Sequence, residues 1–130
     1  MKGIRIIAFV LVFVFSTMSF GADDPSIKGE TRMGIQSAMK SHIDENVFNG
    51  KYLVYDAVEG KLKQLTLKKL HEGIVKKAEY YVSCADFVDN QGNLYDLDLL
   101  VVQQSGDFRV LETVVHSING NKRKYHLEDK

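Results

Sequence analysis

The residues most suited to chemistry in this sequence are three aspartates in two neighbouring segments. These segments, residues 80–89 (YYVSCADFVD) and 94–102 (LYDLDLLVV), are rich in the aromatic and β-branched residues typical of strands. Between them, Asn90-Gln91-Gly92 fits a three-residue hairpin loop in which the glycine supplies the positive φ angle. The two segments are therefore predicted to pair as a central antiparallel hairpin.

The register of this hairpin brings the aspartates together. Asp86 opposes Asp96 and Cys84 opposes Asp98, so Asp86, Asp96 and Asp98 are predicted to form one acidic patch on a shared face. Like charges across a sheet repel one another, and oxygen ligands suit a hard cation such as calcium. The alternative is a solvated face on which Arg109 or lysines compensate the charge. Because no loop of calcium-binding spacing is present, the sequence assigns no metal and no cofactor.

Cys84 is the only cysteine, so an exported chain would have no intramolecular disulfide. Its predicted neighbours, Asp86 and Asp98, disfavour the thiolate that a nucleophile requires. We therefore predict a free thiol that packs as a small, partly buried hydrophobic side chain rather than a catalytic cysteine.

A second candidate site lies in the β-branched segment 108–118. Glu112 and His116 are four residues apart in it and so share a face of a strand. With residues 105–106 as a turn, that face continues the core side of the central hairpin, to which Tyr95 belongs. Glu112, His116 and Tyr95 would then line a concave pocket of a small enzyme or ligand sensor. The alternative is a solvent-exposed strand end, and residues four apart in a strand stand about 13 Å apart, too far for direct cooperation.

One helix and a series of strands are predicted to position these residues. The helical pattern continues to about Asn46 from a cap at Asp24, with Pro25 in the first turn. Asn119-Gly120 is the strongest short hairpin signal in the chain. Residues 68–77 are interpreted as a basic connector, and the further predicted strands are residues 51–56, 61–67, 108–118 and 122–128.

This order of elements predicts an α+β fold, with an N-terminal helix packed on a curved antiparallel meander sheet of four to six strands. Over the mature chain it resembles the cystatin-like and NTF2-like α+β superfamily. The Gln-x-Val-x-Gly hairpin of cystatin-type protease inhibitors has no match, the nearest segments being 64–68 and 103–106. The Asp/His pairs of NTF2-like enzymes have no identifiable equivalents either. The resemblance therefore implies a fold and no particular activity.

Residues 1–21 have the pattern of a secretory signal peptide. A basic start containing Lys2 and Arg5 precedes an apolar stretch, and Ser19 and Gly21 provide small residues before a cut ahead of residue 22. The apolar stretch is about half the length of a bilayer-spanning helix, which needs about 20 residues. We expect a single domain, residues 22–130, that is secreted or periplasmic in a bacterium and has no stable membrane insertion after cleavage.

The charge balance limits the partners of this domain. Removing residues 1–21 leaves 17 − 2 = 15 Lys+Arg against 17 Asp+Glu, a net charge of −2, which gives no general attraction to nucleic acid. With no catalytic motif present, the sequence predicts a small non-catalytic module that binds an unidentified protein or small ligand. Exposed sheet edges would also permit a homodimer. The alternatives are the pocket enzyme or sensor and weak cation binding at the three aspartates.

Overall fold

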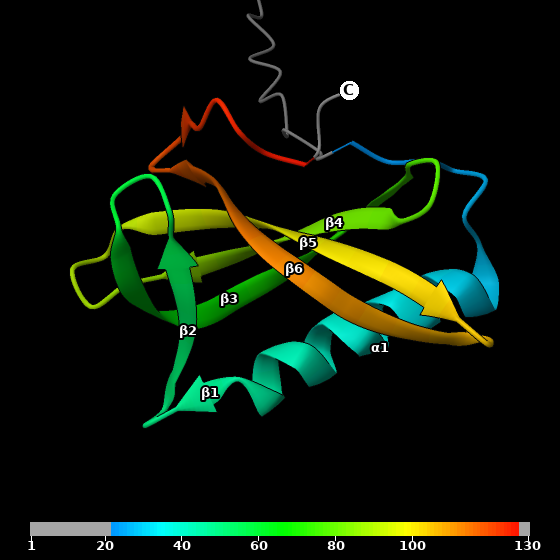
Figure 1. The fold of residues 1–130 in the computed structure, drawn as a ribbon, viewed down its shortest axis with the longest axis horizontal. Coiled ribbons are helices and arrows are strands. Elements are labelled where there is room, and N and C mark those ends of the chain that lie inside the picture. The colour runs from blue at the N-terminus through cyan, green and yellow to red at the C-terminus, as the bar shows by residue number, and fades with distance from the viewer. Residues whose placement is uncertain (1–21, 128–130) are drawn as a thin grey trace, which may run out of the picture.

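The computed structural model describes residues 22–127, and the predicted signal peptide lies outside that range. One helix, α1, precedes a meander sheet in which each strand pairs antiparallel with the next in chain order (Figure 1). The elements are α1 (Gly29–Glu45), β1 (Val47–Phe48), β2 (Lys51–Asp56), β3 (Lys61–Lys76), β4 (Tyr81–Val88), β5 (Leu94–Gln104), β6 (Asp107–Ile118) and β7 (Asn121–Lys122).

The α+β class is confirmed, but within residues 22–127 the sheet has seven strands rather than four to six. The additional strand is β1, which consists of two residues after the helix and is too short to carry an alternating pattern. The predicted last strand, residues 122–128, is also wrong in its extent, because β7 ends at Lys122. Residues 123–127 instead return to the sheet, where Arg123 N–H donates to the carbonyl oxygen of His116.

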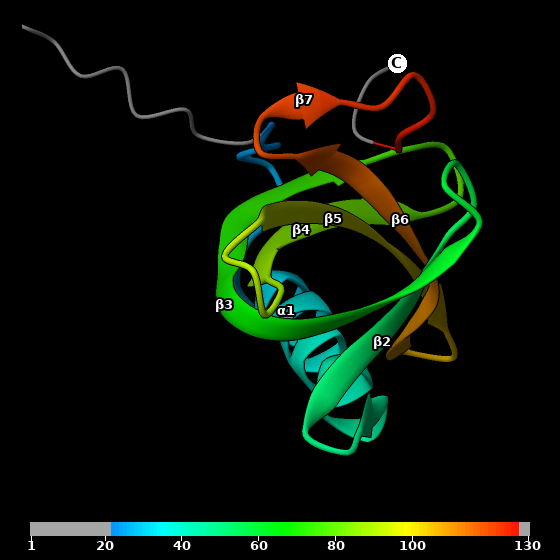
Figure 2. The same cartoon turned by 90° about the vertical axis from the view of Figure 1, so that its left-hand side faces the viewer.

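The sheet curls around α1, as Figure 2 shows. The buried face of the helix presents Ile35, Met39 and Ile43, which follow at four-residue steps and therefore lie on one side. They pack against the concave face of the sheet, whose fully buried side chains include Phe87 and Leu97. Burying this apolar layer is the main source of stability for a domain of this size.

The predicted basic connector, residues 68–77, is wrong, because residues 61–76 form one long strand. The lysines of this strand are half-buried or exposed, so its sequence shows no regular alternation of apolar and polar residues. The segment forms a strand because its backbone pairs with β4. The β3–β4 register shifts between Leu67 and Lys69 and again between Leu70 and Ile74. These bulges bend the strand and interrupt the alternation of its side chains.

The turns predicted from glycine and asparagine are confirmed. Gly92 has φ 81°, and both residues of the Ser105-Gly106 and Asn119-Gly120 turns have positive φ angles. The helix begins at Gly29, later than predicted, because the Asp24 carboxylate accepts hydrogen bonds from Ser26 N–H and Oγ–H in a preceding turn.

The sheet does not close, although β2 and β6 face one another across its opening. The Tyr52 hydroxyl donates to Thr113 Oγ1 at 3.1 Å across this gap. Within residues 22–127, no helix combines the length and the apolar character needed to cross a membrane.

Candidate metal centre

The central hairpin has the predicted register. Cys84 pairs with Asp98, and Asp86 pairs with Asp96, across β4 and β5. These four side chains lie on the outer face of the sheet, opposite the apolar face that packs on α1. Asp98 has no exposed surface, and Cys84 is 4% exposed. The Cys84 thiol is therefore buried beside a buried carboxylate.

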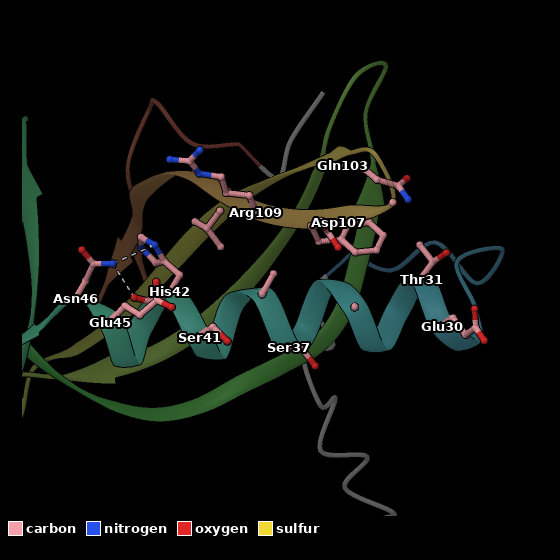
Figure 3. Close-up of a pocket in the computed structure, with 15 residues that line it drawn as sticks. Glu30, Thr31, Ser37, Ser41, His42, Glu45, Asn46, Gln103, Asp107 and Arg109 are labelled. Carbon is pink, nitrogen blue, oxygen red and sulfur yellow. Dashed lines mark hydrogen bonds between the residues drawn. The ribbon is translucent and has the colours of Figure 1, made fainter.

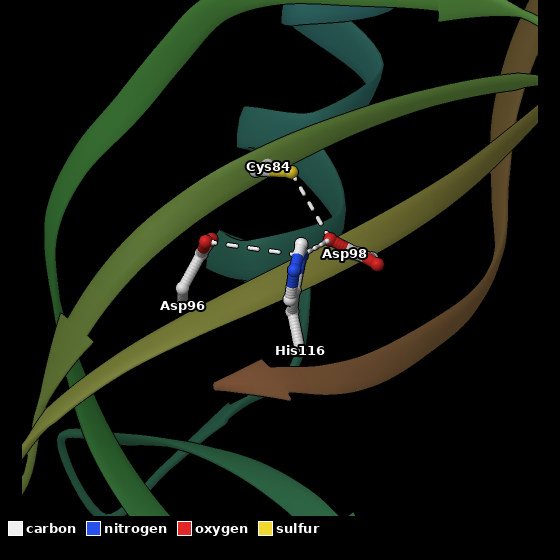
Figure 4. A group of neighbouring side chains, drawn as sticks. All are labelled: Cys84, Asp96, Asp98 and His116. Atoms are coloured by element: carbon white, nitrogen blue, oxygen red, sulfur yellow. Dashed lines mark hydrogen bonds and ion pairs between the residues drawn. The ribbon is translucent and has the colours of Figure 1, made fainter. Parts of the chain in front are cut away.

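A β-bulge in β6 adds His116 to this group. Leu97 pairs with Val115, whereas the adjacent Asp96 pairs with Ser117, so His116 is the extra residue of the bulge. A bulge redirects the side chain of its extra residue. His116 follows Val114, the partner of Asp98, by two residues and so lies on the same outer face beside Asp98 (Figure 4). His116 is 3% exposed.

Asp98 is the common hydrogen-bond acceptor of the cluster. Its Oδ1 accepts from Cys84 Sγ at 3.0 Å and from His116 Nδ1 at 2.8 Å, while its Oδ2 accepts from Leu127 N–H at 2.7 Å. Asp96 Oδ2 lies 3.9 Å from His116 Nδ1. One ligand atom from each of Cys84, Asp96, Asp98 and His116 therefore falls within 4.8 Å of the other three.

The end of the described chain covers the cluster. The His126 ring stacks on the His116 ring, with centroids 4.3 Å apart and an interplanar angle of 4°. Arg123 anchors the same segment through an ion pair of 2.8 Å with Asp56, which is 1% exposed. Residues 123–127 therefore reduce the access of solvent to Asp98 and His116.

The carboxyl group of Asp96 has a raised pKa. Burial raises its pKa to about 6, the charges of His71 and His116 oppose that rise, and Asp98 and Asp86 add to it. Its side chain is 25% exposed. Its Oδ1 is buried and has no hydrogen-bond partner among residues 22–127. A cation would stabilise the charged form of this carboxylate.

A second group, formed by His71, Asp86 and Asp96, adjoins the first. His71 Nε2 lies 2.8 Å from Asp86 Oδ1, and one ligand atom of each residue lies within 4.8 Å of the others. His71 belongs to the wide bulge of β3, where residues 71–73 lie opposite Cys84 alone. The predicted patch is thus divided between two groups that share Asp96, and each group contains a histidine rather than Arg109.

The structure does not bring Glu112, His116 and Tyr95 into one inner pocket. Tyr95 is in the core, whereas Glu112 is exposed and lines a groove of about 370 Å³ between β2 and β6. A second β6 bulge causes this difference, because Leu100 pairs with Glu112 while the adjacent Val101 pairs with Val110. This bulge shifts the alternation of β6 by one residue, so that Glu112, Val114 and His116 lie on the outer face.

A larger groove of about 840 Å³ runs between α1 and β6 (Figure 3). It is lined mainly by small and polar side chains, including Ser37, Ser41 and Arg109. Neither of the groups of metal-ligand residues found in the described part of the chain lies there. The outer face of the sheet is therefore the place where chemically competent side chains converge.

No protein-family model, curated protein or solved structure matches this chain. The chemistry of the site therefore has to be inferred from its geometry. A thiol, an imidazole and carboxylates grouped on adjacent strands match the ligand types of divalent transition metals.

Proposed function

We propose that the mature chain is a small, exported, non-catalytic module that binds a divalent transition metal. Cys84, Asp96, Asp98 and His116 would hold the ion. The observation that carries this proposal is the convergence of their ligand atoms within 4.8 Å from three adjacent strands. Export is supported by the signal-peptide pattern of residues 1–21.

The ligand types favour zinc-like ions over calcium. Calcium takes six to eight oxygen ligands, whereas zinc takes about four ligands drawn from thiolate, imidazole and carboxylate. From the sequence, a hard cation is the alternative to a solvated face, and it is argued from the three aspartates alone. The sulfur of Cys84 and the nitrogen of His116 change that preference.

The charges of the cluster give a reason for an ion to bind. Asp96 and Asp98 lie side by side and largely out of solvent, where two negative charges are costly. A divalent cation would offset this repulsion and would release the Cys84 thiol proton, because the thiolate is the form that binds metals. Metal binding would therefore stabilise the folded chain and weaken as the pH falls.

The enclosure of the cluster supports a non-catalytic role. Structural zinc sites use four protein ligands, whereas catalytic sites keep a position open for water or substrate. Here four ligands are available, and residues 123–127 contact two of them, Asp98 and His116, which are 0% and 3% exposed. An ion at this position would be enclosed by protein.

The proposal is tested by titrating zinc into the reduced, metal-free chain 22–130 and following heat release and melting temperature. At a free zinc concentration one hundred times the dissociation constant, stabilisation of about 2.7 kcal/mol is expected. Cys84→Ser and His116→Ala should abolish the high-affinity phase. Asp44→Asn is the matched control, because Asp44 is an exposed helix carboxylate outside the site, and it should bind zinc normally.

Far-ultraviolet circular dichroism would establish that each variant is folded before titration. The proposal would be contradicted if the parent chain bound no zinc, or if folded Cys84→Ser and His116→Ala bound zinc as tightly as the parent. In that case the cluster would be a hydrogen-bond network that holds residues 123–127 on the sheet.

A further inference from the structure

We propose that His71, Asp86 and Asp96 form a second divalent-metal site, adjacent to the first and linked to it through Asp96. This inference rests on the proposed metal-binding function and extends it from one ion to two. The ligand atoms of the three residues lie within 4.8 Å of one another.

The two sites have a common construction. Two successive cross-strand pairs, Cys84 with Asp98 and Asp86 with Asp96, occupy the outer face of β4 and β5. Each flanking strand then adds one histidine from a bulge, His116 from β6 and His71 from β3. Each histidine lies 2.8 Å from an aspartate oxygen, at Asp98 and Asp86 respectively.

Asp96 lies between these two histidine–aspartate pairs. Its Oδ2 faces His116 Nδ1 at 3.9 Å, and its Oδ1 is a buried oxygen without a hydrogen-bond partner among the described residues. A carboxylate has two oxygens and about four lone-pair positions, so one group can serve two ions. The unsatisfied oxygen is a specific reason for a further cation beside Asp96.

The second site is more open than the first. The side chains of His71, Asp86 and Asp96 are 23%, 27% and 25% exposed, whereas Asp98 and His116 are 0% and 3% exposed. A groove of about 950 Å³ between β3 and the start of α1 is lined by His71 and Asp86. Three protein ligands beside a solvent-accessible groove leave a coordination position for water, as in open zinc sites.

Differences in ligand type predict an order of binding. The first site offers a thiolate and is enclosed, whereas the second offers one imidazole and two carboxylates and is partly solvated. Zinc should therefore fill the Cys84 site first and the His71 site second. The second ion should also exchange more rapidly with a chelator.

The test counts zinc ions per chain by native mass spectrometry and by calorimetry, using His71→Ala and Asp86→Asn. His42→Ala is the control, because His42 is a partly buried histidine outside both groups. The parent chain and the control should bind two ions. His71→Ala and Asp86→Asn should each bind one ion and should retain the thiolate-to-metal absorption band when cobalt(II) replaces zinc.

The possible results distinguish failure of the second site from failure of the first. One ion in the parent together with the thiolate band would overturn the second site and leave the proposed function intact. Two ions in folded His71→Ala and Asp86→Asn would overturn it as well. No ion and no thiolate band in the parent would overturn both proposals. If Cys84→Ser loses only the ion that the parent chain binds first and more tightly, the result would support filling of the Cys84 site before the His71 site.

Discussion

Replacing Asp98 with asparagine should destabilise the metal-free chain strongly, because Asp98 accepts three hydrogen bonds in a fully buried position. Its Oδ1 accepts hydrogen bonds from Cys84 and His116, and its Oδ2 accepts one from the N–H of Leu127. Asparagine has nearly the same shape but only one acceptor oxygen. If that oxygen faces Cys84 and His116, the asparagine side-chain NH2 group faces the backbone N–H of Leu127. Two donors then face one another, and the buried Leu127 N–H has no acceptor.

The magnitude of this loss follows from its two components. An unsatisfied buried donor costs about 1–3 kcal/mol, and each hydrogen bond to a charged group such as a carboxylate contributes about 1.5–3 kcal/mol. We therefore expect Asp98→Asn to lower the free energy of unfolding by about 3–5 kcal/mol. For a domain near 100 residues, about 4–8 °C of melting temperature corresponds to each kcal/mol, so the melting temperature should fall by more than about 10 °C.

Urea unfolding in the presence of a chelator and a reductant measures this quantity without any contribution from metal. Asp44→Asn is the control, since Asp44 pairs with Lys40 on the exposed surface of α1 and should change stability by no more than about 0.5 kcal/mol. A loss below about 1 kcal/mol for Asp98→Asn, with an unchanged denaturant slope, would refute the structural account of the cluster.

Three further predictions test the surroundings of the site. Arg123→Met should cost about 3–5 kcal/mol in urea unfolding, because it leaves the buried carboxylate of Asp56 without its partner. Gly34→Ala should cost about 1–3 kcal/mol despite its gain in helix propensity, because the new Cβ would lie 2.6 Å from the ring of Phe108, and Phe108→Leu should relieve that cost. Asp96→Asn should remove a pH dependence of stability in the metal-free chain. The folded parent retains a proton that the unfolded chain releases, so the parent should lose stability relative to this variant as the pH rises from about 4 to about 6.

Each of these predictions has a contrary result. A change under about 1 kcal/mol for Arg123→Met would show that its ion pair does not hold the C-terminal segment. Added stability in Gly34→Ala would show that the Phe108 ring can move without cost. A parallel pH profile for the parent and Asp96→Asn would show that the Asp96 carboxyl is not perturbed by burial.

Local turn chemistry made the central part of the fold predictable. Asn90-Gln91-Gly92 defines one hairpin register, and that register alone places Cys84 opposite Asp98 and Asp86 opposite Asp96. Because both strands of this hairpin lack bulges, alternation from the turn stays in phase along their whole paired length. The acidic patch and the core-facing position of Tyr95 follow from the same alternation.

The histidines of the site could not be placed in the same way. Counting alternate residues from a turn fails once a bulge adds a residue. His71 lies in a bulge, and a bulge at Leu111 separates the 105–106 turn from His116. A local signal for the β6 bulge exists in the adjacent polar residues His116 and Ser117, which follow two valines and break a strict alternation. The lysine-rich sequence around His71 gives no comparable signal, because its strand is defined by pairing rather than by a buried face.

The covering of the site was also beyond the sequence pattern. Residues 123–127 contain no apolar period, and their position depends on single long-range contacts such as Arg123 with Asp56 and Leu127 with Asp98. Such contacts join residues far apart in the chain, which no local pattern encodes.

Zinc K-edge X-ray absorption on the chain loaded with one equivalent of zinc would identify the ligands of the proposed metal centre. We expect one sulfur ligand at about 2.3 Å, from Cys84, together with nitrogen and oxygen ligands at about 2.0–2.2 Å in a four-coordinate shell. The sulfur contribution should be absent in Cys84→Ser. A shell made only of nitrogen and oxygen in the parent chain, or a spectrum unchanged by Cys84→Ser, would contradict the assignment of Cys84, Asp96, Asp98 and His116 as the metal centre.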